Sequence, residues 1–198
     1  MRHFFSLITL LCALPTLAAT VQVQVLDGAG ASLPDAVVFL ESKEALTAVK
    51  PMQSAEVAQV GRQFDPQVRV VTVGTAVQFP NRDSVRHQVY SYSDIKRFEI
   101  KLYAGTTASP VLFDKPGIAV LGCNIHDSMV AWIVVVPTPY FGRSGPDGKL
   151  AFDGLPAGNY RLRTWHTRLP VGMPALDQPL TVPATGATVA VRLAGLTP

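Results

Sequence analysis

The sequence of 198 residues is poor in charge. Asp, Glu, Lys and Arg together make up only 16% of it, and no segment gathers lysines and arginines into a dense cluster. The formal charge of +3 is too small and too dispersed for a nucleic-acid-binding protein. Hydrophobic residues reach 48%, which argues against a disordered chain and allows a substantial core.

Long apolar runs are missing after the first twenty residues, so the mature chain offers no membrane-spanning segment. The beginning, MRHFFSLITLLCALPTLAA, is different. It has the positive charge of Arg2, an apolar stretch over 4–14, and small residues that place cleavage after Ala18 or Ala19. We interpret residues 1–19 as a secretory signal peptide, which predicts a periplasmic or otherwise exported protein.

Cysteine is scarce. Removal of the signal peptide removes Cys12 and leaves Cys123 as the one cysteine of the mature chain. A disulfide within one chain is then impossible. A free thiol in an oxidising compartment is at risk of oxidation unless it is buried or bound to a metal. Cys123 is therefore a candidate functional residue.

The usual patterns of catalytic groups are also missing. The sequence has no pair of carboxylates at a spacing that suggests acid–base chemistry, no Ser/His/Asp order and no phosphate-binding glycine loop. We therefore expect that the protein is not an enzyme.

The chain is instead rich in short segments typical of β-strands. They alternate with period two or contain many β-branched and aromatic residues, and Gly, Pro, Asn and Asp separate them. The predicted strands are 21–26, 68–73, 76–79, 87–91, 97–103, 117–121, 129–136, 150–152, 160–165 and 188–193. Only 45–58 suggests a turn or two of helix. The predicted fold class is all-β, with sandwich architecture.

One short segment, 120-VLGCNIHDSMVAW-132, carries most of the candidate chemistry. It holds a thiol, an imidazole and a thioether at Cys123, His126 and Met129, each three residues from the next. Each of these residue types can serve either as a metal ligand or as an ordinary core residue. A second imidazole must come from His87 or His166. We favour His87, where a loop turns into a strand, and interpret His166 as a structural histidine.

One thiolate, two imidazoles and a weak axial thioether form the ligand set of a mononuclear electron-transfer copper site. Thiolate and thioether favour Cu(I), and imidazole suits both oxidation states. Zinc is the alternative for the Cys/His/His part, but Met129 would be a poor zinc ligand. The sequence therefore predicts one copper ion per chain.

These residues resemble those of the cupredoxins, and among them the amicyanin type. The downstream pattern C-x-x-H-x-x-M is met by 123–129, and the upstream pattern N-R-acidic-x-x-x-H-x-V by 81–89. The resemblance covers about residues 54–137. It implies a cupredoxin Greek-key β-sandwich and a type 1 (blue) copper site with ligands His87, Cys123 and His126, together with Met129.

The resemblance also implies roles for residues around the ligands. Asn81 is expected to tie its loop to Asn124, the residue after the cysteine. The backbone N–H of Gln88 is expected to point at the copper-bound sulfur. Such outer bonds fix ligand geometry. The edge of His126 is expected to lie at the surface and to serve as the exit for the electron.

The chain departs from the amicyanin pattern beside the ligands. Ile125 and Asp127 replace prolines around the second histidine, and Arg86 replaces the proline before the first. The acidic Asp127 should stabilise Cu(II), within the limits of solvent screening. The run FDKPG…LGCNIHD at 113–127 is similar to exported proteins labelled methylamine-utilisation proteins.

The two ends of the chain resemble parts of a second sandwich, of the transthyretin-like or carboxypeptidase-regulatory-like type. The opening segment 21–41 is similar to its first two strands, and 143–166 carries its L-P-A-G-x-Y run. The proline- and glycine-rich joint at 137–148 marks a boundary. We therefore expect residues 20–50 and 140–198 to form this sandwich, with residues 54–137 as the cupredoxin domain. The alternative is an N-terminal strand added to the cupredoxin domain, followed by a separate C-terminal sandwich.

Three functions compete at this point. The first is an exported carrier of single electrons between a redox donor and an acceptor, both unidentified. The second is a periplasmic copper-binding module for delivery or storage. The third is a structural or interaction protein in which the metal is incidental. The four-ligand set leaves copper no open position for a substrate, which favours the first over catalysis.

Overall fold

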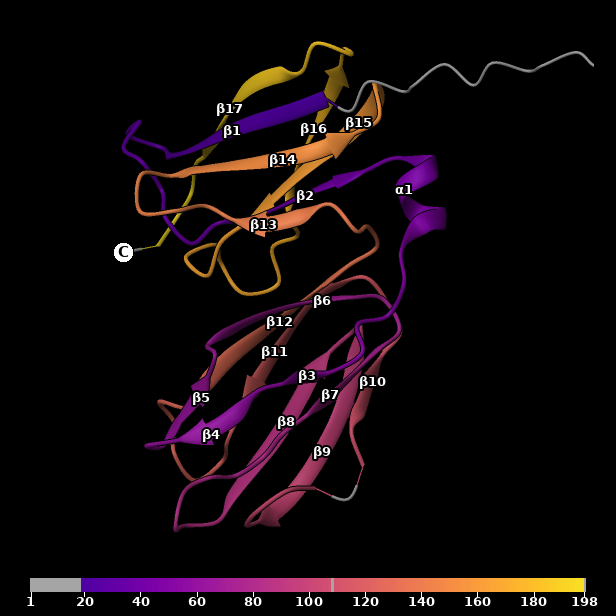
Figure 1. The fold of residues 1–198 in the computed structure, drawn as a ribbon. Coiled ribbons are helices and arrows are strands. Elements are labelled where there is room, and N and C mark those ends of the chain that lie inside the picture. The colour runs from indigo at the N-terminus through magenta and orange to yellow at the C-terminus, as the bar shows by residue number, and fades with distance from the viewer. Residues whose placement is uncertain (1–18, 108, 198) are drawn as a thin grey trace, which may run out of the picture.

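The computed structural model describes residues 19–107 and 109–197, and it confirms the all-β prediction. Figure 1 shows an upper body that contains both ends of the described chain and a lower body built from its middle. The predicted signal peptide lies outside the described residues except for Ala19, which is buried and begins the first strand. Among the described residues, no helix has the length and apolar character needed to cross a membrane.

The upper body consists of strands from both chain ends. These strands are β1 (Ala19–Asp27), β2 (Val37–Glu41), β13 (Phe141–Arg143), β14 (Lys149–Leu155), β15 (Gly158–Trp165), β16 (Leu176–Val182) and β17 (Ala187–Leu193). One sheet has the order β14-β1-β17, and the other has the order β13-β2-β15-β16. Strand β1 thus lies between two strands from the C-terminal part of the chain. It is parallel to β17 and antiparallel to β14.

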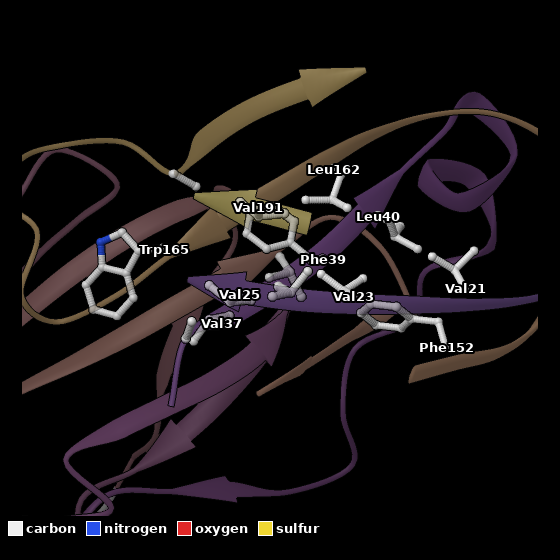
Figure 2. Close-up of a cluster of buried hydrophobic side chains, with 14 of the residues drawn as sticks. Val21, Val23, Val25, Val37, Phe39, Leu40, Phe152, Leu162, Trp165 and Val191 are labelled. Carbon is white, nitrogen blue, oxygen red and sulfur yellow. The ribbon is translucent and has the colours of Figure 1, made fainter. Parts of the chain in front are cut away.

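The core of the upper body follows from the alternation of side chains along β1. Val21, Val23 and Val25 are buried, whereas the glutamines between them face outward or lie partly exposed. Figure 2 shows these valines beside Phe39 and Leu162. The N-terminal strand therefore packs against side chains from more than a hundred residues further along the chain.

The lower body contains the remaining strands. They are β3 (Ala55–Glu56), β4 (Ala58–Val60), β5 (Gln63–Asp65), β6 (Val68–Thr72), β7 (Thr75–Gln78), β8 (His87–Ser93), β9 (Lys96–Tyr103), β10 (Val111–Phe113), β11 (Gly117–Gly122) and β12 (Val130–Val136). The largest sheet has the order β6-β12-β11-β8-β9, a second has the order β10-β7-β3, and β4 pairs with β5. A separate cluster of buried side chains lies inside this body.

A short helix connects the two bodies in Figure 1. Helix α1 (Lys43–Ala48) begins after Ser42, whose hydroxyl oxygen accepts a hydrogen bond from the N–H of Ala45 at 3.1 Å. The sequence predicted a turn or two of helix within 45–58, and α1 overlaps the beginning of this range. Towards the end of the same range, Ala55–Glu56 forms β3 and pairs with β7.

The two bodies share hydrophobic contacts. The outward-facing side chains of β12 and β6, among them Val68, Val134 and Val136, belong to the core cluster of the upper body. The rings of Trp132 and Trp165 lie 6.2 Å apart, one from each body. The large sheet of the lower body is therefore covered on both faces over part of its area.

Leu40 offers a test of the upper core. Its side chain is fully buried, and Leu40→Ala should lower the free energy of unfolding by about 2–5 kcal/mol through lost burial and the cavity left behind. Leu46→Ala is the matched control, because Leu46 on α1 is 48% exposed. Urea denaturation of both variants measures the difference, and equal stabilities would contradict the packing described.

Candidate metal centre

The centre forms where β8 and β11 lie side by side. Gly122, at the end of β11, pairs with Tyr90 of β8, so the residue after Gly122 lies beside the beginning of β8. That residue is Cys123, and β8 begins with His87. The following loop then folds back, with the N–H of Met129 donating to the carbonyl of His126 at 2.9 Å.

This folding brings three of the four predicted ligands together. One side-chain ligand atom from each of His87, Cys123 and His126 lies within 4.8 Å of the other two. The two imidazole rings are 5.0 Å apart at an angle of 61°. His87 and Cys123 are buried, and His126 is partly exposed. The group is closed on the side of the core and open on the side of His126.

The Nδ1 atoms of both histidines show what the group could hold. Both are buried, and neither has a hydrogen-bond partner among the described residues. A buried polar atom without a partner is costly and needs an explanation, and a bound metal ion is one that suits two such nitrogens at the same place. Two unpartnered ring nitrogens beside a buried thiol are suitable donors for a soft or borderline-soft metal ion.

Asp83 fixes the orientation of His87. Its carboxylate lies 2.8 Å from Nε2 of His87, on the far side of the ring from the unpartnered Nδ1. The same carboxylate accepts hydrogen bonds from the N–H groups of Gly61 at 2.6 Å and Arg62 at 2.9 Å. A carboxylate on the outer nitrogen of a ligating histidine fixes its tautomer, so that Nδ1 is free to bind a metal.

The turn that binds Asp83 has an unusual backbone. Gly61 and Arg62 form the two-residue connection between β4 and β5, with φ angles of 61° and 60°. This is the left-handed conformation expected of a tight hairpin turn, and it presents both N–H groups to one anion. The hydrogen bond from the Arg62 N–H lowers the pKa of the Asp83 carboxyl most. The hydrogen bonds with His87 and with the Gly61 N–H lower it further. Asp83 therefore remains charged and able to accept from His87.

Met129 lies in the interior of the lower body. Its side chain is fully buried and belongs to the same cluster of buried residues as Cys123. This position is equally suited to core packing and to a thioether ligand approaching from inside. Its role as the fourth ligand stays a prediction.

The Asn81 side chain makes three hydrogen bonds within the lower body. The Asn81 side chain donates to the carbonyls of Val85 at 2.9 Å and Tyr103 at 2.8 Å. Its oxygen accepts from the N–H of Asp83 at 3.0 Å. Within residues 19–107 and 109–197, no hydrogen bond joins Asn81 to the exposed Asn124. Both N–H donors of the amide are used by backbone carbonyls, one in its own loop at Val85 and one at the end of β9 at Tyr103.

Gln88 lies at an irregularity in the sheet. The register between β8 and β9 shifts between the pairs His87–Tyr103 and Val89–Ile100, which leaves Gln88 out of the pairing. Its side chain donates to Glu99 at 2.7 Å. The expected contact of its backbone N–H with the Cys123 sulfur stays a prediction.

Tyr103 lies beside the site, although the sequence did not indicate a role for it there. Burial, and to a smaller extent the nearby Cys123, raises the pKa of its phenol to about 12, although the hydrogen bond with Gln59 acts in the opposite direction. The phenol donates to the carbonyl of Phe79 at 2.5 Å and accepts a short bond from Gln59. Because Tyr103 pairs with His87 across the sheet, these bonds add to the rigidity of the strand that holds this histidine.

His166 does not join the centre. It follows β15 in the upper body, is buried, and accepts a hydrogen bond on Nδ1 from the N–H of Arg168 at 3.1 Å. Burial is the main cause that lowers its pKa. This environment is that of a structural histidine in a turn.

No family model matches the sequence, and no curated protein matches it. Comparison with solved structures finds similar copper proteins. A copper-containing nitrite reductase from Thermus scotoductus SA-01 is 29% identical, with a TM-score of 0.40 over 45% of this chain. The chain spans only 23% of that enzyme.

Two smaller proteins are also similar. A reduced Cu(I) form of an amicyanin variant is 19% identical, with a TM-score of 0.39 over 50% of this chain and 98% of its own. A purple cupredoxin from Nitrosopumilus maritimus is 22% identical, with a TM-score of 0.38 over 42% of this chain and 100% of its own. These TM-scores are all below 0.5, so the choice of metal below rests on the residues of this chain.

The carboxylate of Asp83 gives a direct prediction. Asp83→Asn keeps the shape of the side chain but weakens its hold on His87, and we expect the affinity for copper to fall about ten- to a hundredfold. Competition against a chelator of known affinity measures the change. Asp114→Asn is the control, because that carboxylate is exposed and bonded only weakly to Lys96 at 3.7 Å. Unchanged affinity in Asp83→Asn would show that Asp83 has no part in the centre.

Proposed function

We propose that this protein is an exported type 1 copper protein that carries single electrons between two redox partners. The copper ligands are His87, Cys123 and His126, with Met129 as the axial ligand and one copper ion per chain. The observation that supports this most is the pair of unpartnered, buried Nδ1 atoms beside the buried thiol.

The donor set favours copper over other metals. A thiolate with two imidazoles is the trigonal set of electron-transfer copper sites, and a buried thioether is available on the inner side. Structural zinc would need a fourth strong donor, which Met129 does not supply. Bound copper supplies a one-electron change between Cu(II) and Cu(I), and both forms accept these ligands.

The surrounding residues keep the site rigid while the charge of the metal changes. Asp83 holds the ring of His87, and the hairpin turn at 61–62 holds Asp83. Cys123 and Met129 are packed among strands of the core. A site that cannot relax around either oxidation state has little reorganisation to undergo, which suits electron transfer.

His126 provides the route to the surface. It is the most exposed member of the group, and exposed Ile125 and Asp127 lie on either side of it along the chain. A partner that approaches here reaches a ligand edge directly. Delivery of copper to another protein would be served better by an open, flexible site than by a thiol that is 4% exposed.

We propose that the chain forms two domains, one of which is inserted into a loop of the other. Residues 20–50 and 140–198 supply the sheets of the upper body, and residues 54–137 supply those of the lower body. An insertion of this kind is tolerated where the ends of the inserted segment lie close together. Cleavage of the signal peptide after Ala18 would leave β1 whole, because β1 begins at Ala19.

A visible spectrum recorded during titration with Cu(II) tests the proposal. We expect an intense band from charge transfer between thiolate and Cu(II), saturating at one copper per chain. Cys123→Ser should abolish the band, because the serine hydroxyl is not a soft donor. His126→Gln should reduce it strongly, whereas His166→Gln, outside the centre, should leave it unchanged. A colourless titration of the unaltered protein would overturn the copper-carrier proposal.

Voltammetry of the copper-loaded protein separates electron transfer from delivery. We expect a reversible one-electron couple. In Met129→Leu the couple should persist at a higher potential, because loss of a weak axial donor destabilises Cu(II) more than Cu(I). An irreversible response, with release of copper on reduction, would favour the delivery function instead. A potential that is the same in Met129→Leu would assign Met129 to core packing.

A further inference from the structure

A groove of about 600 Å³ lies between the two bodies, away from the open side of the metal centre. Its floor is the outer face of β8, β11 and β12, and its wall is the loop between β15 and β16, over residues 169–174. Both bodies are therefore needed to form it. Grooves of this size at the junction of two domains are common binding sites for small molecules.

The floor of the groove is the reverse side of the strands that carry the metal ligands. Side chains alternate along a strand, so Tyr90 and Gly122 face the groove, whereas Val89 and Cys123 face the core of the lower body. A Cβ atom at Gly122 would lie 2.6 Å from the ring of Tyr90. The ring therefore rests directly against the backbone at Gly122, and the glycine is required for this contact.

The groove has four aromatic side chains with unused hydrogen-bond donors. Tyr90, Tyr92, Trp132 and Trp165 all line it. Tyr90 and Tyr92 lie 5.1 Å apart, and the two tryptophans 6.2 Å apart. In the part of the chain that the structure describes, these two phenol O–H groups donate no hydrogen bond. The two indole N–H groups donate none there either. A ligand that fills the groove would gain both stacking contacts and donors.

The charge of the groove is close to zero. Asp94 is the one carboxylate among the lining residues, and it lies at 3.0 Å from the guanidinium of Arg97. Ser93 also lines the groove, and its hydroxyl oxygen accepts a hydrogen bond from the N–H of Val120 at 2.9 Å; the other lining residues are apolar or aromatic. A neutral ligand is therefore favoured over an anion or a strongly solvated cation.

We propose that this groove binds a neutral, planar, conjugated cyclic diketone of the quinone class. Such a molecule has a flat ring to stack on the tyrosine and tryptophan rings. Its carbonyl oxygens accept hydrogen bonds and can therefore replace the water that the phenol and indole donors lose when a ligand covers them. A purely apolar molecule would leave these donors unpaired. This site contains no metal ligand, so the quinone proposal can be tested separately from the copper proposal.

Intrinsic fluorescence measures the binding directly, because the two tryptophans of the chain both line the groove. The probe is duroquinone, a fully substituted quinone whose ring has no free position for addition of the Cys123 thiol. The protein is used free of metal, so that copper does not quench the signal. We expect saturable quenching with one equivalent bound per chain.

Variants with matched controls identify the site. Tyr90→Phe combined with Tyr92→Phe keeps both rings but removes two donors, and it should weaken binding about five- to tenfold. Tyr140→Phe is the control, because this tyrosine packs against Tyr160 in the upper body. It should bind duroquinone like the unaltered protein.

Two results would overturn the proposal. Quenching that rises linearly with duroquinone and is the same in every variant would show collisions only. Durene, which has a planar six-membered carbon ring with four methyl groups at the same positions but no carbonyl oxygens, tests the chemical class in competition. If durene displaces duroquinone at equal concentration, the groove is an apolar surface without selectivity for carbonyl compounds. If durene does not compete and the tyrosine variant binds weakly, the quinone-class site is supported.

Discussion

The metal centre depends on the pairing of β8 with β11. These strands are neighbours in the large sheet, and the pair Gly122–Tyr90 sets the end of one beside the beginning of the other. His87 and Cys123 are far apart in sequence and meet only because of this register. A one-residue slip would turn either side chain to the opposite face of the sheet. The hydrogen bond that the Asp83 carboxylate accepts then orients the ring of His87, and the hairpin turn at 61–62 orients Asp83.

The same sheet connects the centre to the second body. One of its faces carries the ligands, and the other is covered in part by strands from the two chain ends. Because the core is shared through β6 and β12, the upper body supports the sheet in which the ligands are held. Where this cover stops, the sheet forms the floor of the aromatic groove. The second body thus has a structural reason to be present even where it contributes no ligand.

Local patterns predicted the strands and the grouping of ligands well. Alternating β-branched residues mark β1, β12 and β17, and the spacing of Cys123 and His126 places both on one tight loop. Short strands such as β3, β5 and β10 contain too few residues to show a strand pattern. Pro179 interrupts the strand pattern of β16, which lies at the edge of its sheet. The roles of Asp83 and Asn81 could not be predicted either, since the partner of a loop side chain depends on loop geometry.

The central claim is that a thiolate and two imidazoles from this chain bind one copper ion. X-ray absorption at the copper edge, on protein loaded with one equivalent, tests this claim most directly because it identifies the atoms around the metal. The account predicts one sulfur at short distance and two imidazole nitrogens, and the loss of that sulfur in Cys123→Ser. A copper ion surrounded only by nitrogen and oxygen in the unaltered protein would contradict it.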